Sequence, residues 1–137
     1  MKSNLITLAA MVVLVVALVV HGASMQWTEV NVVGAVLAGV SMVLFVVARL
    51  QLGASFSVAA KAHKLVTTGI YAKIRNPIYV FGGLFIVGVG LMLGRWQLLA
   101  LIVILVPMQI VRARKEERVL AEAFGEEYVR YKAGTWF

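Results

Sequence analysis

Two polar segments of this 137-residue sequence hold most of the side chains that could do chemistry. The first, Gly69–Tyr79, contains Arg75, and the second contains the adjacent carboxylates Glu116 and Glu117. A carboxylate beside a buried surface needs a cationic partner or water. Ion pairing between the two segments is therefore the chemistry that these residues favour, provided that the rest of the chain brings them together.

The residues before Arg75 belong to a polar connection of about 25 residues, Gln51–Asn76, and connections of this length are often functional. It carries the titratable ring of His63 and the flexible Gly69. Pro77 disfavours helix at the residue before it and suits the first turn of a helix, so Asn76 is the expected N-cap. A helix start flanked by basic residues is the simpler interpretation of this segment.

Four uncharged apolar runs surround the polar segments, in a chain that is 62% hydrophobic with a mean hydropathy of +0.95. Soluble domains are nearer half apolar, and a membrane-spanning helix needs about 20 apolar residues. We therefore predict an all-α integral membrane protein with four transmembrane helices in a single domain, residues 1–137. The predicted ranges are transmembrane helices at about 4–22, 30–49, 77–93 and 96–112, a cytoplasmic loop at 50–76, and a C-terminal amphipathic helix and tail at 113–137.

The basic residues indicate the orientation. Twelve of the 13 Lys and Arg residues fall on one side of a four-helix topology, and Arg95 alone falls on the other. Basic loops face the cytoplasm, so the loop at 50–76 and both termini are expected there, in a bacterial or archaeal inner membrane. The net charge of +7 then reflects topology and attraction to anionic membrane lipids, and no nucleic-acid partner is expected.

The acidic residues and the absence of Cys exclude other functions. Five of the six Glu lie between Glu116 and Glu127, and no apolar run contains an acid, which argues against a proton-coupled transporter. Without Cys there is no thiolate nucleophile or Cys-ligated metal, and we expect no metal site. The first apolar run could be mistaken for a signal peptide. Its length is at the upper limit for the apolar core of such a peptide, so we expect a membrane helix there.

Helix phasing places both glutamates of the pair beside a packed face that includes Leu120 and Phe124, at about 100° per residue. Pairing with Arg112, one turn earlier, would explain Glu116 locally, but Glu117 has Ala at both i−4 and i+4. Gly125 then suggests a helix end, and the aromatic tail after it either lies at the membrane interface or folds back on the loop.

The third and fourth runs are separated by Gly94 and Arg95 alone, so they are expected to form a tight antiparallel hairpin. Such a hairpin returns the chain to the side that it left. Arg75 and Glu117 are therefore expected to meet at one membrane surface.

With these elements in place, the sequence resembles the isoprenylcysteine carboxyl methyltransferases and the phospholipid methyltransferases that share their membrane fold. The resemblance covers about residues 53–136. The residues that carry it are His63, Gly69, Tyr71, Arg75, Asn76, Pro77, Tyr79, Arg112, Arg114, Glu116, Glu117, Leu120, Phe124, Gly125, Tyr128 and Tyr131.

The resemblance implies an S-adenosylmethionine-dependent methyltransferase without a Rossmann domain, whose lipophilic acceptor enters from the bilayer. The implied acceptor is an isoprenylcysteine-like carboxylate or a related small lipid. The alternatives are phospholipid or amine N-methylation, and a non-catalytic membrane protein or transporter of the same fold. Catalytic roles are implied for Arg75, Glu116 and Glu117. The residues implied to bind the cofactor are His63, Leu65, Val66, Gly69, Tyr71, Arg75, Asn76, Pro77, Tyr79, Glu116 and Glu117.

These residue types suit that cofactor, because a Glu can pair with its ammonium and an Arg with its carboxylate. In-line methyl transfer depends mainly on positioning and on the exclusion of water. A base is needed only where the acceptor starts protonated, and a Glu or His63 is then the local candidate. Two positions depart from the family pattern: Asn76 stands where many members have His, and Phe81 stands where a small residue is common. The identity of the acceptor is therefore not carried over.

Overall fold

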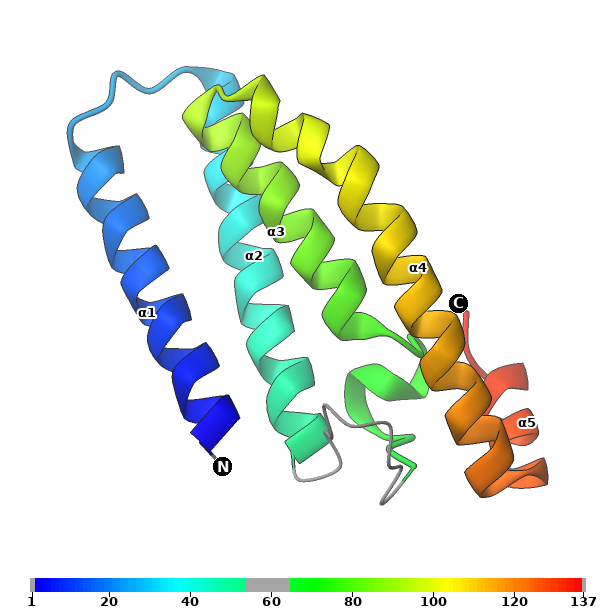
Figure 1. Ribbon diagram of the computed structural model, residues 1–137. Coiled ribbons are helices and arrows are strands. Elements are labelled where there is room, and N and C mark those ends of the chain that lie inside the picture. The colour runs from blue at the N-terminus through cyan, green and yellow to red at the C-terminus, as the bar shows by residue number, and fades with distance from the viewer. Residues whose placement is uncertain (1, 54–64, 137) are drawn as a thin grey trace.

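The structure is a computed structural model and describes residues 2–53 and 65–136. Every regular element in these ranges is helical, which confirms the predicted all-α architecture (Figure 1). The elements are α1 (Lys2–Ala23), α2 (Glu29–Leu52), the short 3-10 helix η2 (Gly69–Ala72), α3 (Pro77–Leu93), α4 (Trp96–Phe124) and α5 (Glu126–Ala133).

Three of the helices are long and apolar enough to cross a membrane: Leu5–Ala23 within α1, all of α2, and α4. The outward side chains of these helices are largely aliphatic, and Val13 and Val103, for example, are 69% and 76% exposed. Soluble proteins rarely expose contiguous apolar surface on this scale. Helix α3 is apolar too, but its 17 residues are at the lower limit of about 17 for a span.

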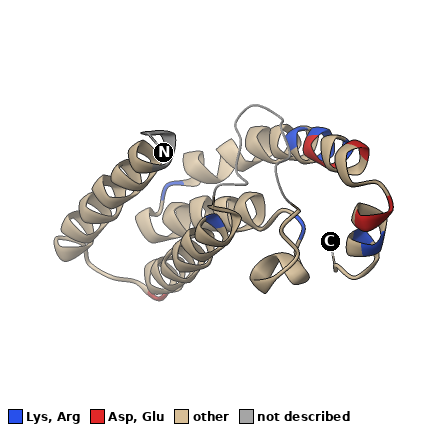
Figure 2. Ribbon diagram, turned by 90° about the horizontal axis from the view of Figure 1, so that it is seen from below, with Lys and Arg blue, Asp and Glu red and all other residues tan. Residues whose placement is uncertain are grey.

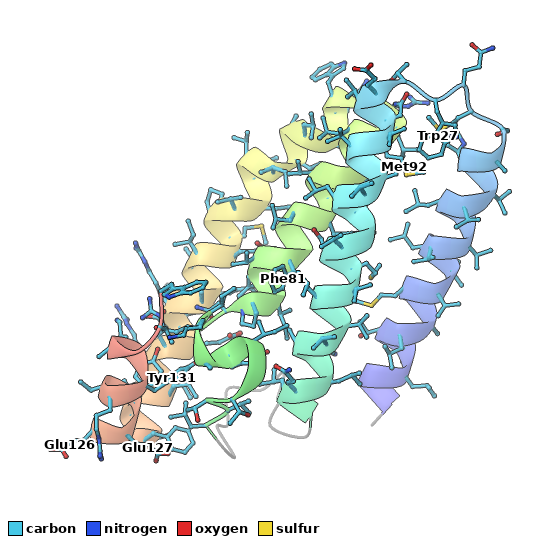
Figure 3. The ribbon with its side chains drawn as sticks, turned by 180° about the vertical axis from the view of Figure 1, so that it is seen from behind. Trp27, Phe81, Met92, Glu126, Glu127 and Tyr131 are labelled. Carbon is cyan, nitrogen blue, oxygen red and sulfur yellow. The ribbon has the colours of Figure 1, made fainter. Side chains whose placement is uncertain are left out.

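Successive long helices run in opposite directions, so the chain returns repeatedly to the same end of the bundle (Figure 1). One end, drawn at the bottom of Figure 1, holds residues 65–76 and 112–136, and we call it the polar end. Figure 2 shows that the charged residues of α4 and α5 gather there. Trp27 and Met92 lie at the opposite end from Tyr131 (Figure 3).

Helices α2 and α3 approach so closely that glycine is required where they cross. A Cβ atom at Gly88 would lie 2.5 Å from the backbone nitrogen of Ala38, and one at Gly34 would overlap the backbone of Met92. The side-chain amide of Asn31 donates to the carbonyl oxygens of Leu91 (3.3 Å) and Met92 (2.8 Å). Both carbonyls belong to the last turn of α3, where the regular helical partners run out, and that of Leu91 also accepts from the Gly94 nitrogen at 3.2 Å. These contacts hold α2 against the C-terminal part of α3.

Helix α3 turns into α4 through Gly94, whose φ of 61° is left-handed and suits the end of a helix. The predicted tight hairpin is confirmed. Helix α4 then continues to Phe124 without a break, so residues 113–124 extend the membrane helix and are not a separate one. The charges that begin at Arg112 mark the passage from lipid to water. They do not end the helix, because neither Gly nor Pro occurs between Arg112 and Gly125. The predicted helix end at Phe124 is confirmed, and α5 follows it.

Candidate active site

Glu117 of α4 lies between two cations from other segments. Its Oε1 is 3.5 Å from Nη1 of Arg75, which follows η2, and its Oε2 is 3.5 Å from Nζ of Lys132 on α5. The side chains of Arg75 and Glu117 are 18% and 23% exposed, whereas that of Lys132 is 53% exposed. The expected meeting of the two polar segments is confirmed, and Glu117 has the cationic partners that its position requires.

Glu116 is held by a different helix. The hydroxyl of Tyr79, in the first turn of α3, donates a short hydrogen bond to its Oε1. Among the residues that the structure describes, both ion pairs within 4 Å belong to Glu117, so the local pairing of Glu116 with Arg112 is not formed. The neighbouring carboxylates therefore tie α4 to two different segments, α3 through Glu116 and the residues after η2 through Glu117.

Four buried polar atoms beside this cluster have no hydrogen-bond partner among the described residues. They are Nε and Nη1 of Arg75, of which Nη1 is also the atom that faces Glu117 at 3.5 Å, and the hydroxyl oxygens of Tyr71 and Tyr128, the second of which lies near Arg75. Most buried polar groups in proteins are hydrogen-bonded, and those that are not often face a ligand. All four can donate a hydrogen bond, so they suit a group that accepts hydrogen bonds, such as a carboxylate.

The tyrosines of the polar end are kept neutral. Burial raises the pKa of the Tyr71 phenol well above its ordinary value, and the nearby Tyr131 and Glu116 raise it further. Burial also raises the pKa of Tyr131 to about 12, with Tyr128 acting in the same direction and Arg75 against it. The Tyr131 hydroxyl therefore keeps its proton at neutral pH, and it donates to the backbone carbonyl of Tyr71 at 2.7 Å.

Two hydrogen bonds hold residues 69–73, which come just before Arg75 in the chain. Gly69 begins η2 with a φ of 61°, and a Cβ atom there would overlap the side chain of Gln51. The Oε1 of Gln51 accepts a hydrogen bond from the Ile70 nitrogen at 2.9 Å. From the other side, the Trp136 nitrogen donates to the carbonyl of Lys73 at 2.7 Å. Of the two alternatives for the aromatic tail, the structure therefore selects the one that folds back on the loop.

Comparison with known proteins now adds to this geometry. Residues 30–127, from the first turn of α2 into α5, match the family model for phospholipid methyltransferases. The chain belongs to the phospholipid methyltransferase family. It is also 37% identical over 91 residues to the Protein-S-isoprenylcysteine O-methyltransferase of Schizosaccharomyces pombe. That alignment covers 62% of this chain and 39% of the relative, so the chain spans well under half of its length. No solved structure matches.

Membership in the phospholipid methyltransferase family agrees with the apolar helices, and the chain is an integral membrane protein. Enzymes of this family generally use S-adenosylmethionine as the methyl donor. The matched range contains Arg75, Tyr79 and the Glu116–Glu117 pair. It ends before Tyr131 and Lys132, so the contacts of α5 with the cluster lie outside it.

The structure brings together five of the residues singled out from the sequence: Tyr71, Arg75, Tyr79, Glu116 and Glu117. Three others have a supporting place. Asn76 occupies the N-cap position of α3 without a side-chain cap, Pro77 is buried in the first turn, and Gly69 begins η2. Leu65 is buried and Val66 half-buried at the start of the described loop, and His63 lies outside the described residues.

Sequence reasoning did not place Lys132, Tyr128, Tyr131 or Gln51 among the candidate site residues. The two tyrosines offered a signal, because they lie three residues apart and so share one face of α5. Lys132 offered none, since its approach to Glu117 depends on the angle at which α5 leaves Gly125.

Proposed function

We propose that this chain is an integral membrane, S-adenosylmethionine-dependent methyltransferase that methylates a lipophilic acceptor at the polar end of its bundle. The observation that carries the proposal is the cluster in which Nη1 of Arg75 faces Glu117 at 3.5 Å, while neither this atom nor the buried Nε of Arg75 makes a hydrogen bond to a described residue. A buried charged cluster with unused donors indicates a binding site more readily than a purely structural one.

The cluster fits the charges of the cofactor. S-adenosylmethionine carries a carboxylate, an ammonium and a sulfonium. Arg75, together with the hydroxyls of Tyr71 and Tyr128, offers donors to the carboxylate, and Glu117 offers an acceptor to the ammonium. The exposed Lys132 is then the partner of Glu117 that an ammonium would replace.

The role of the protein in the reaction is mainly positioning. When bound, the cofactor supplies a methyl group activated by the positive sulfonium, and its transfer is an in-line displacement. Tyr79 fixes Glu116, and Glu117 fixes Arg75, so each charged group is held from a second segment. The buried rings of Tyr71 and Tyr128 exclude water from the same region. Orientation and water exclusion of this kind lower the barrier to displacement.

We favour a carboxylate as the acceptor, which makes the reaction an O-methylation. An amine acceptor must lose a proton before it attacks, and therefore needs a base. Within the described residues, Glu116 and Glu117 are both already engaged with donors. A carboxylate is ionised at neutral pH and needs no base. The name of the Schizosaccharomyces pombe relative, an O-methyltransferase, supports this choice, whereas the family name favours N-methylation of a phospholipid.

We further propose that α3 is the fourth span and that the polar end is cytoplasmic. Helix α3 packs against both α2 and α4 and runs antiparallel to each, so it shares their environment. The polar end holds Arg75, Lys73 and the basic residues of α4 and α5, which the positive-inside tendency assigns to the cytoplasm. Both termini are then cytoplasmic, and the acceptor reaches the site from the bilayer.

The test is methyl transfer from methyl-labelled S-adenosylmethionine by the purified protein in vesicles. The acceptors are an S-prenylated cysteine and phosphatidylethanolamine, offered separately. Label that mild base releases from the prenylcysteine indicates a carboxyl ester and supports the proposal in full. Base-stable label on the phospholipid amine would support the methyltransferase activity, but it would show that the acceptor is an amine and not a carboxylate. If neither acceptor is labelled by protein that retains its helical circular dichroism, these acceptors are excluded.

A further inference from the structure

The outward face of α4 at the polar end carries three basic residues that take no part in the proposed active site. Arg114, Lys115 and Arg118 are all exposed, and we call them the basic face. At about 100° per residue they fall within an arc of about 100° around the helix. The exposed aliphatic residues Ile104 and Val111 lie in the same arc, one to three turns closer to the middle of the bundle.

The depth of the basic face can be estimated from the helix rise. At about 1.5 Å per residue, Arg114 to Arg118 lie about 27 to 33 Å along the axis from Trp96, where α4 begins. The hydrocarbon core of a bilayer is about 30 Å thick. If Trp96 lies at one interface, the basic face therefore lies at the level of the lipid phosphates on the other side. Glu122, the next exposed acid, is one turn farther out, at about 39 Å.

Among the described residues, no ion pair accounts for these cations. The two ion pairs of the described residues are both made by Glu117, with Arg75 and Lys132. Arg114, Lys115 and Arg118 are thus exposed next to exposed aliphatic residues, in the charged part of α4 that Figure 2 shows. A basic cluster immediately beyond a membrane span is typical of a segment that binds anionic lipid.

We propose that the basic face is a binding site for the phosphate headgroup of an anionic phospholipid, whose acyl chains lie along Ile104 and Val111. The partner is chosen by charge and by depth, because a phosphate at this level meets three cations and aliphatic surface directly beside them. The inference depends on the membrane helix α4 and is independent of the methyl-transfer reaction. Each cation near an anionic surface is expected to raise local lipid affinity about fivefold at most.

The experiment measures which lipid contacts this part of α4. The three native tryptophans are replaced by Phe, and a single reporter is introduced by Val111→Trp, at a side chain that is 52% exposed. The protein is reconstituted in vesicles of phosphatidylcholine mixed with acyl-brominated phosphatidylglycerol or acyl-brominated phosphatidylcholine. Quenching by each brominated lipid gives its relative binding constant beside the reporter. We expect the anionic lipid to bind about tenfold more strongly, and the preference to weaken with added salt.

Two variants make the result specific to the basic face. The triple substitution Arg114→Gln, Lys115→Gln and Arg118→Gln is expected to bring the preference to within about twofold of unity. The control Arg95→Gln removes a cation at the other end of α4 and is expected to leave the preference unchanged. Equal quenching by both lipids in the unsubstituted chain would overturn the proposal, as would a preference that survives the triple substitution. Unchanged quenching by phosphatidylcholine shows that the triple variant is correctly inserted.

Discussion

The guanidinium of Arg75 lies 3.5 Å from the carboxylate of Glu117, and this contact joins the connection after η2 to the last third of α4. Both side chains are mostly buried, so neither charge is fully compensated by water. Removing one member of such a pair is costly because it leaves the other charge desolvated and alone. The pair is therefore expected to affect both the stability of the protein and the binding of the cofactor. Substitutions that keep the charge separate these two effects.

Arg75→Lys is one such substitution. It keeps the positive charge beside Glu117 but removes the planar set of donors that includes Nε and Nη1, neither of which makes a hydrogen bond to a described residue. If those donors bind the cofactor carboxylate, the KM for S-adenosylmethionine should rise about tenfold, with a smaller effect on kcat. Arg114→Lys, on the exposed face of the same polar end, is the matched control and should leave KM unchanged. An equal KM for Arg75→Lys and the unsubstituted protein would remove the guanidinium from the cofactor site.

Tyr79→Phe tests the hydrogen bond that holds Glu116, the other carboxylate of the pair. The substitution removes the hydroxyl that donates to Glu116, and a hydrogen bond to a charged acceptor contributes about 1.5 to 3 kcal/mol. We expect kcat/KM to fall about tenfold or more, because Glu116 is no longer held. In a double-mutant cycle, Glu116→Ala should add little to Tyr79→Phe, since both remove one contact. Full additivity would show that the two side chains act separately.

Gly34→Ala should destabilise the crossing of α2 and α3. Its Cβ atom would overlap the backbone of Met92, so the two helices must separate to make room. Overpacking of this kind costs about 1 to 3 kcal/mol. Gly39→Ala is the matched control on the same helix, because a Cβ atom there meets nothing within 4 Å. Unfolding in mixed detergent micelles should show a lower midpoint for Gly34→Ala alone, and equal midpoints would contradict the close approach.

The docking of α5 should depend on pH through Tyr131. Its pKa is raised to about 12 in the folded protein, compared with about 10 for a free tyrosine. The folded state therefore holds the proton more tightly, and the stabilisation from Tyr131 is fully present below about pH 10 and lost as pH rises towards about 12. Tyrosinate absorbance, titrated for the unsubstituted chain and for Tyr131→Phe, gives this midpoint by difference. A difference titration centred near pH 10 would contradict the buried hydrogen bond to Tyr71.

The sequence predicted the helices better than the contacts between them. Hydropathy located α1 to α4, Pro77 and Gly94 marked the ends of α3, and helix phasing turned Glu117 toward the packed side. These signals are local, so they can be read from neighbouring residues. The continuation of α4 to Phe124 was not predicted, because the charges after Val111 were interpreted as the beginning of another helix.

The contacts of the site depend on how separate segments pack. The position of Lys132 beside Glu117 depends on the direction of α5 after Gly125, whose φ of 52° no local pattern specifies. The bond from Tyr79 to Glu116 needs the register of α3 against α4. The hydrogen bond from the Ile70 nitrogen to the Gln51 side chain joins two segments that are separated in sequence by residues outside the described ranges. The sequence predicted that these regions meet at one surface, but it did not predict which of their side chains are in contact.

The most direct test of the proposed function is calorimetric titration of the purified protein in detergent with S-adenosylmethionine. Three forms are compared: the unsubstituted chain, Glu117→Gln, and Glu122→Gln as an exposed control on the same helix. We predict that the unsubstituted chain and Glu122→Gln bind with equal affinity. Glu117→Gln should bind at least about 30-fold more weakly, as expected when a charge partner worth about 2 kcal/mol is removed. Absence of binding to the unsubstituted chain, or equal binding by all three forms, would contradict the proposed site.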